Sequence, residues 1–308
     1  MALKTWQVHT ENQKVNLPIL EEKKVSLFIK REDKIHPLIS GNKYRKLKYN
    51  IKKAKIAQYQ TLLTFGGAFS NHVVATACAA HENGLQSVGI IRGEELAFKW
   101  KDNPTLVKAT ALGMQLKFVT RSDYRNKHSI EFIEQLKAEY GHFYLLPEGG
   151  TNELAVKGCE EILTEEDNHF NVVCSSVGTG GTIAGIINSV SSEQRVIGFP
   201  ALKGDFLRED ICKFATKEQW NLQMDYHFGG YGKVSAQLIN FINDFKNETQ
   251  IPLDPIYTGK MMFGILDMVK KDEFEQDAKI LAIHTGGLQG IVGMNKILKK
   301  KNLPLIDL

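Results

Sequence analysis

The chain has 308 residues, of which 43% are hydrophobic and 24% are charged, a composition typical of an ordinary globular protein. The 39 basic and 35 acidic residues leave a net charge of only +4, and no basic strip with interleaved aromatic residues favours nucleic-acid binding. No window approaches a membrane span and the N-terminus lacks a signal-peptide core, so we expect a cytoplasmic protein without membrane or nucleic-acid partners. At this length, two domains that share a cleft are the expected organisation.

Short apolar segments alternate with amphipathic helical patterns along the chain, which is typical of a parallel α/β sheet. The pattern predicts extended segments at 25–30, 61–65, 87–91, 115–119, 143–146, 172–175, 195–199 and 279–283. It predicts helices after Asn42, around 73–81, and at 152–165, 235–245, 259–271 and 288–300. No proline-rich or serine-rich linker separates two halves, so we expect one domain to be inserted within the other.

The segment Gly41-Asn42-Lys43-Tyr44-Arg45-Lys46 follows an extended run and places Lys43 at the start of a predicted helix. The positive end of a helix dipole disfavours the ammonium form of a lysine, and burial in a cleft acts in the same direction. Both effects favour the free amine that Schiff-base chemistry with an aldehyde needs, although most lysines in a chain are simply solvated. The opposite face of this helix is rich in lysine, and we expect it to face water.

A glycine-containing turn at 66–72 connects a predicted strand to the next helix. Ser70 is placed to cap this helix, and the same helix N-terminal amides are able to bind a carboxylate, so the two roles are compatible. Asn71 offers a donor to a phenolate-type oxygen. His72 is either a satisfied polar residue or an acid/base, and the structural role is the favoured interpretation of a lone histidine.

A second glycine cluster, Val177-Gly178-Thr179-Gly180-Gly181-Thr182, lies between an apolar strand and a predicted helix. Glycines let the backbone approach an anion, and helix N-terminal amides supply donors. The loop lacks the lysine of a nucleoside-triphosphate loop and is not a clean G-x-G-x-x-G after the first strand. A single phosphate on a compact cofactor fits best, while an ordinary tight turn remains the alternative.

Two later segments also place polar side chains at element ends. Tyr257 and Thr258 precede a predicted helix in a turn that is also explained as an ordinary loop-to-helix connection, and Thr285 ends the strand at 279–283. The four cysteines form no C-x-x-C pair, and buried thiols are favoured over a metal or redox role. We expect no metal site.

Taken together and in this order, these segments resemble the family of 1-aminocyclopropane-1-carboxylate deaminase and D-cysteine desulfhydrase. The most specific match is the segment 41–47, which is similar to the family's lysine motif G-N-K-x-R-K-L, and the resemblance extends from Lys30 to Gly287. It implies an α/β fold of the tryptophan synthase β-like type (fold type II), with two open twisted, mainly parallel sheets flanked by helices. It also implies pyridoxal 5'-phosphate in a cleft between a discontinuous large domain, 1–45 plus 152–308, and an inserted small domain, 46–151. A homodimer is implied as well.

The resemblance assigns roles by position. Lys43 is expected to hold the cofactor aldehyde as a Schiff base, and Asn71 to bond the pyridoxal hydroxyl oxygen. Ser70 is expected at the substrate carboxylate or as a nucleophile, Tyr257 matches a catalytic tyrosine, and Thr258 is expected near the pyridine nitrogen. The remaining implied contacts are a phosphate cradle of Val177, Gly178, Thr179, Gly180, Gly181 and Thr182, a cofactor contact at Thr285, and substrate contacts from Ser70, Asn71, His72 and Tyr257.

Two positions bear on the reaction. Members that open a cyclopropane ring resemble one another in having glutamate and leucine where this chain has Thr258 and Thr285. A hydroxyl does not stabilise a protonated pyridine as a carboxylate does, so the ring withdraws electrons less strongly. We therefore expect β-elimination of a small amino acid. The best candidate is D-cysteine, which would yield pyruvate, ammonia and sulfide. The alternatives are ring opening of the cyclopropane amino acid to 2-oxobutanoate and ammonia, and a binding protein without turnover.

Overall fold

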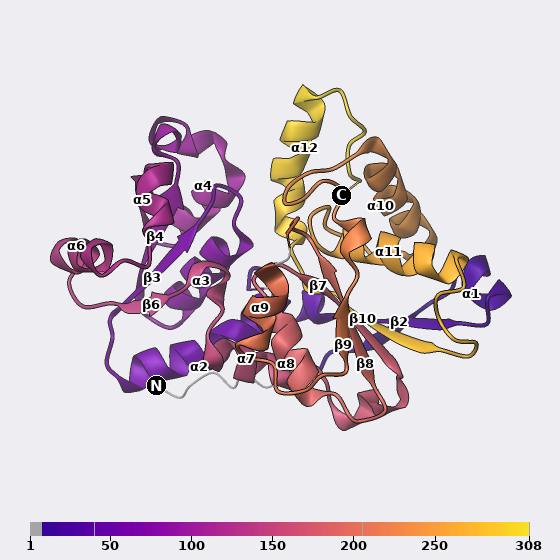
Figure 1. The fold of residues 1–308 in the computed structure, drawn as a ribbon. Helices are drawn as coiled ribbons and strands as arrows, with labels where there is room; N and C mark the ends of the chain where they lie inside the picture. The colour runs from indigo at the N-terminus through magenta and orange to yellow at the C-terminus, as the bar shows by residue number, and fades with distance from the viewer. Residues whose placement is uncertain (1–7, 40, 205, 308) are drawn as a thin grey trace.

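The computed structural model describes residues 8–39, 41–204 and 206–307, and their strands form two separate sheets (Figure 1). The larger sheet has six strands in the order β1-β2-β10-β7-β8-β9. Its strands are β1 (Asn12–Val15), β2 (Ser26–Lys30), β7 (Val172–Val177), β8 (Arg195–Pro200), β9 (Trp220–Leu222) and β10 (Lys279–Ile283). Only β1 pairs in the antiparallel sense, with β2, and the other pairs are parallel.

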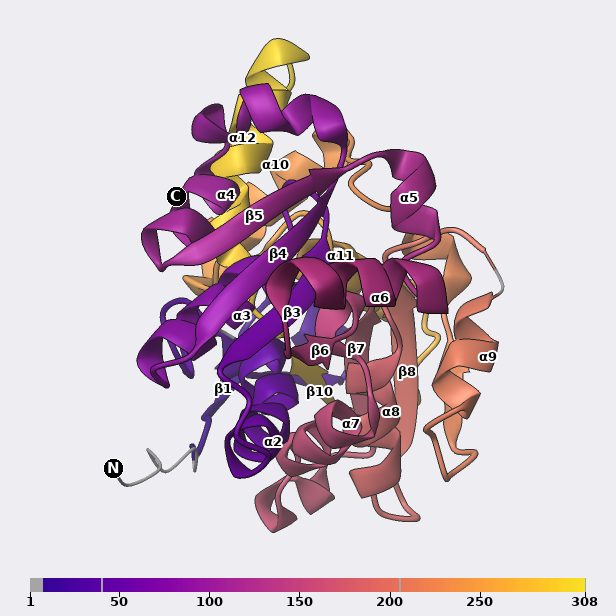
Figure 2. The same cartoon turned by 90° about the vertical axis from the view of Figure 1, so that its left-hand side faces the viewer.

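The smaller sheet has four parallel strands in the order β5-β4-β3-β6. They are β3 (Thr61–Gly66), β4 (Gln86–Arg92), β5 (Met114–Val119) and β6 (Tyr144–Leu146). In the view turned by 90° about the vertical axis, this sheet and its helices lie in front of the larger sheet (Figure 2). All strands of the smaller sheet come from one stretch of sequence, whereas the larger sheet uses segments from both sides of it. The exact domain boundaries remain a prediction.

The helices flank both sheets. Those up to the end of the smaller sheet are α1 (Pro18–Glu22), α2 (Asn42–Ile56), α3 (Asn71–Glu82), α4 (Pro104–Ala111), α5 (Arg121–Arg125) and α6 (Ile130–Tyr140). The later ones are α7 (Glu153–Cys159), α8 (Gly181–Ser189), α9 (Phe206–Cys212), α10 (Ala236–Thr249), α11 (Thr258–Lys270) and α12 (Ile291–Lys300). Within the described ranges, none of the helices is long and apolar enough to cross a bilayer.

The strands predicted from the apolar pattern are all present, within one or two residues of their expected ends. The helix predicted at 152–165 is wrong in length, because α7 ends at Cys159 and short 3-10 turns follow at Glu160–Ile162 and Glu165–His169. Thr164 is extended there and forms a capping box with Asp167, which starts a new turn instead of continuing the helix. The short edge strands β1 and β9 were not predicted.

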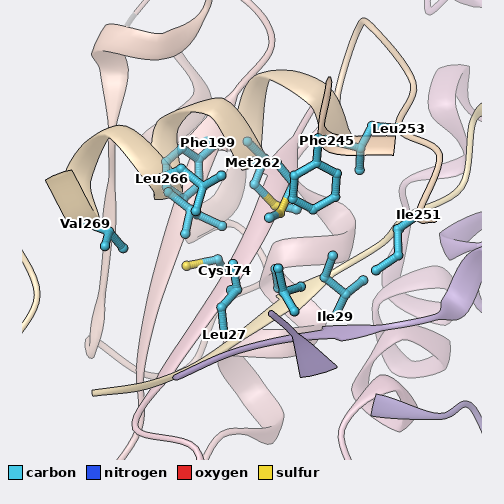
Figure 3. Close-up of a cluster of buried hydrophobic side chains, with 14 of the residues drawn as sticks. Leu27, Ile29, Cys174, Phe199, Phe245, Ile251, Leu253, Met262, Leu266 and Val269 are labelled. Atoms are coloured by element: carbon cyan, nitrogen blue, oxygen red, sulfur yellow. The ribbon is translucent and has the colours of Figure 1, made fainter. Parts of the chain in front are cut away.

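The largest apolar core lies between the large sheet and α10 and α11 (Figure 3). Met262 and Leu266 lie one turn apart on α11 and face Leu27 and Cys174 of the sheet, in agreement with helical spacing on one buried face. Three of the four cysteines, Cys78, Cys159 and Cys174, are buried as predicted, and Cys212 is exposed.

Truncation of Leu27 to alanine removes a fully buried side chain from this core. We expect a loss of about 3 kcal/mol in the free energy of unfolding, because the close-packed surroundings cannot collapse into the cavity. Chemical denaturation measures the change. Ile56, which is 72% exposed, provides the control, and Ile56→Ala should cost less than about 0.5 kcal/mol. Equal effects of the two substitutions would contradict the core assignment.

Candidate active site

The segment with Lys43 is fixed to the carboxyl end of β10. Asn42 N donates to the carbonyl oxygen of Thr285 at 3.3 Å. Gly41, with φ +61°, approaches so closely that a Cβ atom there would lie 2.0 Å from the same oxygen. Only glycine permits both the left-handed backbone and this contact. The first turn of α2 therefore begins at the edge of the large sheet, where ligands bind in open α/β folds.

Lys43 lies in the first turn of α2, and its Nζ donates to Asn42 Oδ1 at 3.2 Å. Asn42 in turn donates through Nδ2 to Thr182 Oγ1 at 2.8 Å, which connects the lysine segment to the glycine loop. Burial, followed by repulsion from the Lys46 ammonium, lowers the pKa of Lys43 to about 7. This direction agrees with the lowered pKa expected from the sequence, and burial is its main cause.

Lys46 lies one turn further along α2 and is an exception to the expectation that the lysine-rich face of this helix is wet, which holds for Lys52 and Lys53. Its side chain is 2% exposed, and its Nζ donates to Gly149 O at 3.1 Å and Thr151 Oγ1 at 2.9 Å. In the described part of the chain no carboxylate lies within 4 Å of this ammonium, and burial lowers its pKa to about 8. The i, i+3 spacing from Lys43 was the sequence signal that was missed.

The glycine loop at 177–182 lies beside Lys46. Gly180, with φ +79°, precedes α8, whose first residues are Gly181 and Thr182, and Thr179 Oγ1 lies 3.4 Å from Lys46 Nζ. A Cβ on Gly178 would lie 3.1 Å from the Tyr257 ring, and one on Gly181 would lie 2.7 Å from the Thr151 side chain. The loop therefore combines bare backbone, a helix N-terminus and a buried cation, which together favour an anion.

Ser70, Asn71 and His72 begin α3 on the other side of the site. Ser70 Oγ accepts a long hydrogen bond of 3.4 Å from Val73 N, which confirms its role as a cap. Asn71 Oδ1 accepts from Gln289 Nε2 at 3.2 Å, so the start of α3 meets the segment that follows β10. Asn71 therefore lies against the large-sheet half of the molecule.

His72 is sealed rather than presented to a ligand. Its side chain is 1% exposed, and Gly150 packs so closely against the ring that a Cβ there would lie 2.6 Å from His72 Cε1. Burial, and then Lys43 and Lys46, hold its pKa well below the ordinary value, so the imidazole is neutral. This geometry favours the structural role of His72 and gives no support to an acid/base role.

Asp254 organises the segment that carries Tyr257 and Thr258. One carboxylate oxygen accepts from Ile256 N and Tyr257 N, and the other accepts from the amide and hydroxyl of Thr258. Thr258 Oγ1 also accepts from Asp254 N at 2.8 Å, and its side chain is fully buried. Its hydroxyl is thus committed to Asp254. The Thr285 hydroxyl, in contrast, shares a 3.1 Å hydrogen bond with Ser176 Oγ, and that partner is uncharged.

Tyr231 is a candidate site residue that the sequence did not reveal. Its ring lies 6.3 Å from that of Tyr257 in an edge-to-face arrangement, and 46% of it is exposed. Burial, then Tyr231 and Asp254, raise the pKa of Tyr257 well above its ordinary value, so this phenol keeps its proton. Tyr231 lies in a stretch, 202–233, without a legible periodic pattern, and only the folded chain brings it to Tyr257.

Comparison with known proteins agrees with this arrangement. Residues 6–286 match the family model described as pyridoxal-phosphate dependent enzyme. A protein of Pyrococcus abyssi named "Putative 1-aminocyclopropane-1-carboxylate deaminase" is 32% identical over 89% of this chain and 88% of its own. The bifunctional D-cysteine desulfhydrase/1-aminocyclopropane-1-carboxylate deaminase of Arabidopsis thaliana mitochondria is 29% identical over 90% of this chain and 75% of its own.

A solved structure gives the same result for the fold. The crystal structure of a homologue of 1-aminocyclopropane-1-carboxylate deaminase superposes with a TM-score of 0.81 and 28% identity, over 97% of this chain and 95% of the other. The predicted two-sheet, tryptophan synthase β-like fold is confirmed. The chain belongs to the pyridoxal-phosphate dependent enzymes, within the family of 1-aminocyclopropane-1-carboxylate deaminase and D-cysteine desulfhydrase.

Proposed function

We propose that this enzyme is a lyase that removes the Cα proton of a small amino acid and expels a group from Cβ, with D-cysteine as the best substrate. The observation that carries the proposal is the environment of Lys43. Its amine has a pKa of about 7 and is connected through Asn42 to Thr182 of an anion-binding loop. The same site therefore offers a neutral amine for an aldehyde and a cradle for a phosphate.

The residues present fit pyridoxal phosphate. Among the described residues, the close partners of the buried Lys46 ammonium are a carbonyl and hydroxyls, which do not neutralise its charge. A phosphate in the loop 177–182 would supply the missing negative charge, and such charge-assisted hydrogen bonds are strong. Lys43 would hold the cofactor through its amine. Asn71 would bond a ring oxygen of the cofactor. Its Nδ2 lies beside the backbone of Gly287, where an added Cβ would be 3.2 Å away.

When bound, pyridoxal phosphate supplies an electron sink for the charge that develops at the substrate Cα. The amides at the start of α3, with Ser70, bind the substrate carboxylate, because a helix N-terminus attracts anions. Once the substrate's own amino group has replaced it on the cofactor, the released Lys43 amine would take the Cα proton, and its pKa near 7 suits a general base at neutral pH. Tyr257 keeps its proton and would donate a hydrogen bond to the leaving sulfur, which departs from Cβ as a thiolate. The released aminoacrylate then takes up water and yields pyruvate and ammonia.

The two threonines support β-elimination over ring opening. Neither Thr258 nor Thr285 carries a charge, and both oxygens of the nearby Asp254 carboxylate are occupied by hydrogen bonds from residues 256–258. A cofactor ring without a free carboxylate partner is the weaker electron sink, and loss of a thiolate demands less of it than rupture of a carbon–carbon bond. Ring opening of the cyclopropane amino acid is the second candidate, because curated relatives carry that name. A cytoplasmic homodimer completes the proposal, by resemblance.

Uptake of the cofactor should depend on pH through the Lys43 amine. Because only the neutral amine attacks an aldehyde, the rate of uptake by cofactor-free protein should rise through about pH 7 and then level off, whereas an unperturbed lysine titrates near 10.4. Stopped-flow absorbance at the visible band of the bound cofactor measures this rate. Lys43→Ala should show no such band and essentially no turnover. A rate that keeps rising above about pH 9 would contradict the lowered pKa.

Removal of the Lys46 charge should weaken phosphate binding in particular. Lys46→Met should lower the affinity for pyridoxal phosphate by about 10- to 100-fold, the loss of a hydrogen bond to a charged group. Affinity for pyridoxal, which lacks the phosphate, should change little. Equilibrium titration by absorbance compares the two ligands. Lys52, exposed on the same helix, provides the control substitution Lys52→Met. Equal losses for both ligands would place the phosphate elsewhere.

The substrate is decided by a keto-acid release assay with D-cysteine, L-cysteine and 1-aminocyclopropane-1-carboxylate in parallel. We expect pyruvate and sulfide from D-cysteine, and at least about tenfold lower kcat/KM for the cyclopropane amino acid, a difference of about 1.4 kcal/mol in transition-state stabilisation. The double variant Thr258→Glu/Thr285→Leu should shift this ratio toward ring opening. Release of 2-oxobutanoate as the dominant activity of the unaltered enzyme would refute the choice of D-cysteine.

A further inference from the structure

Lys260 is a second buried lysine without a carboxylate, and it lies outside the groups that the proposed reaction uses. It is in the first turn of α11, three residues after Tyr257, and is 2% exposed. Its Nζ donates to the carbonyl oxygens of His227 and Gly230, each at 2.9 Å. Burial lowers its pKa to about 8, and only the Asp254 charge opposes that shift. Lys30, another buried lysine, instead pairs with Asp167 at 3.0 Å.

The two carbonyls belong to one tight loop, 227–230, whose closed conformation requires a cation between them. Phe228, Gly229 and Gly230 all have positive φ angles, between 51° and 110°, so the backbone reverses sharply and turns both carbonyls toward Lys260. The His227 carbonyl also accepts from Gly230 N at 3.0 Å. Two converging carbonyl dipoles repel each other unless a donor lies between them, and a compact ammonium with three protons satisfies both.

The loop leads directly into Tyr231. The Lys260 hydrogen bonds therefore join the helix that begins after Tyr257 to the loop that carries Tyr231, and the two tyrosine rings meet edge to face. Burial of an ammonium is costly, and the neighbouring side chains Met261 and Met262 show that this end of α11 accommodates apolar residues. A charge retained here, with no carboxylate partner in the described residues, points to a specific task at the loop.

We propose that Lys260 is a positioning residue that holds the loop 227–233 closed and so sets Tyr231 against Tyr257 at the exposed edge of the site. The role in substrate binding rests on the proposed function, whereas the mechanical role does not. Without the ammonium, the two carbonyls turn to water and the loop opens. The substrate then meets a site in which only a fraction of molecules present Tyr231, and its apparent affinity falls by that fraction.

Hydrogen exchange tests the mechanical role on the cofactor-loaded enzyme. In Lys260→Met, the amides of Gly230 and Lys233, which donate to loop carbonyls, should exchange at least about tenfold faster, equivalent to about 1.4 kcal/mol of local opening. Amides of the central strands β7 and β10 should keep their rates. The control is Lys270→Met, which removes an exposed lysine from the same helix. Unchanged loop exchange, or acceleration spread over the whole protein, would overturn the proposal.

Steady-state kinetics with D-cysteine test the functional role. We expect Lys260→Met to raise KM about tenfold and to lower kcat less than about threefold, because opening reduces the fraction of binding-competent enzyme. A tenfold fall in kcat at unchanged KM would overturn the proposed role of Lys260 in substrate binding. If the methionine variant does not fold, Lys260→Gln decides: its amide nitrogen is one bond shorter and cannot span both carbonyls, so the same changes are expected. If the wild-type enzyme does not act on D-cysteine, the proposed function is refuted. The hydrogen-exchange result still tests the mechanical role of Lys260 in that case.

Discussion

The contact between the backbone of Gly41 and the carbonyl of Thr285 is the constraint on which the site depends. It brings the start of α2 onto the carboxyl edge of the large sheet, within a distance that excludes any side chain at position 41. The amide of Asn42 secures the contact with a hydrogen bond. The position and direction of Lys43 follow from this junction, because the lysine is the second residue of the helix that starts there.

From this junction the site extends through hydrogen bonds. Lys43 bonds Asn42, Asn42 bonds Thr182, and Lys46 reaches the backbone and hydroxyls around the glycine loop. Two cations so close to each other are tolerable only if one of them gives up its proton or an anion joins them. Burial and the Lys46 charge together make Lys43 the more easily deprotonated of the two lysines. In the proposed function, the same electrostatics would favour both a reactive amine at Lys43 and a phosphate beside Lys46.

The buried lysines differ in their hydrogen-bond partners, and these partners determine what each lysine does. Lys30 has a carboxylate partner, Asp167, and forms an ordinary internal ion pair. Lys46 and Lys260 are equally buried, yet both are held by carbonyl or hydroxyl oxygens. In our proposals, Lys46 binds the phosphate of the cofactor, while Lys260 holds the loop 227–233 closed through hydrogen bonds to its carbonyls. Their surroundings in the folded protein, which the sequence does not display, decide between these tasks.

The sequence by itself determined the central strands, the helices that flank the site and the family. Apolar runs of strand length and the glycine turns that follow them predict the parallel strands, since a buried strand must be apolar and its turn needs glycine. The same local reasoning predicted a perturbed lysine at position 43 and the cap at Ser70. Only the tertiary structure decided that Lys46 and Lys260 are buried, that Thr258 is bound by Asp254, and that Tyr231 meets Tyr257. Whether a charged side chain is buried, and which distant segments touch, depends on how the helices and strands pack. Periodicity along the chain does not show which polar face of a helix another segment will cover.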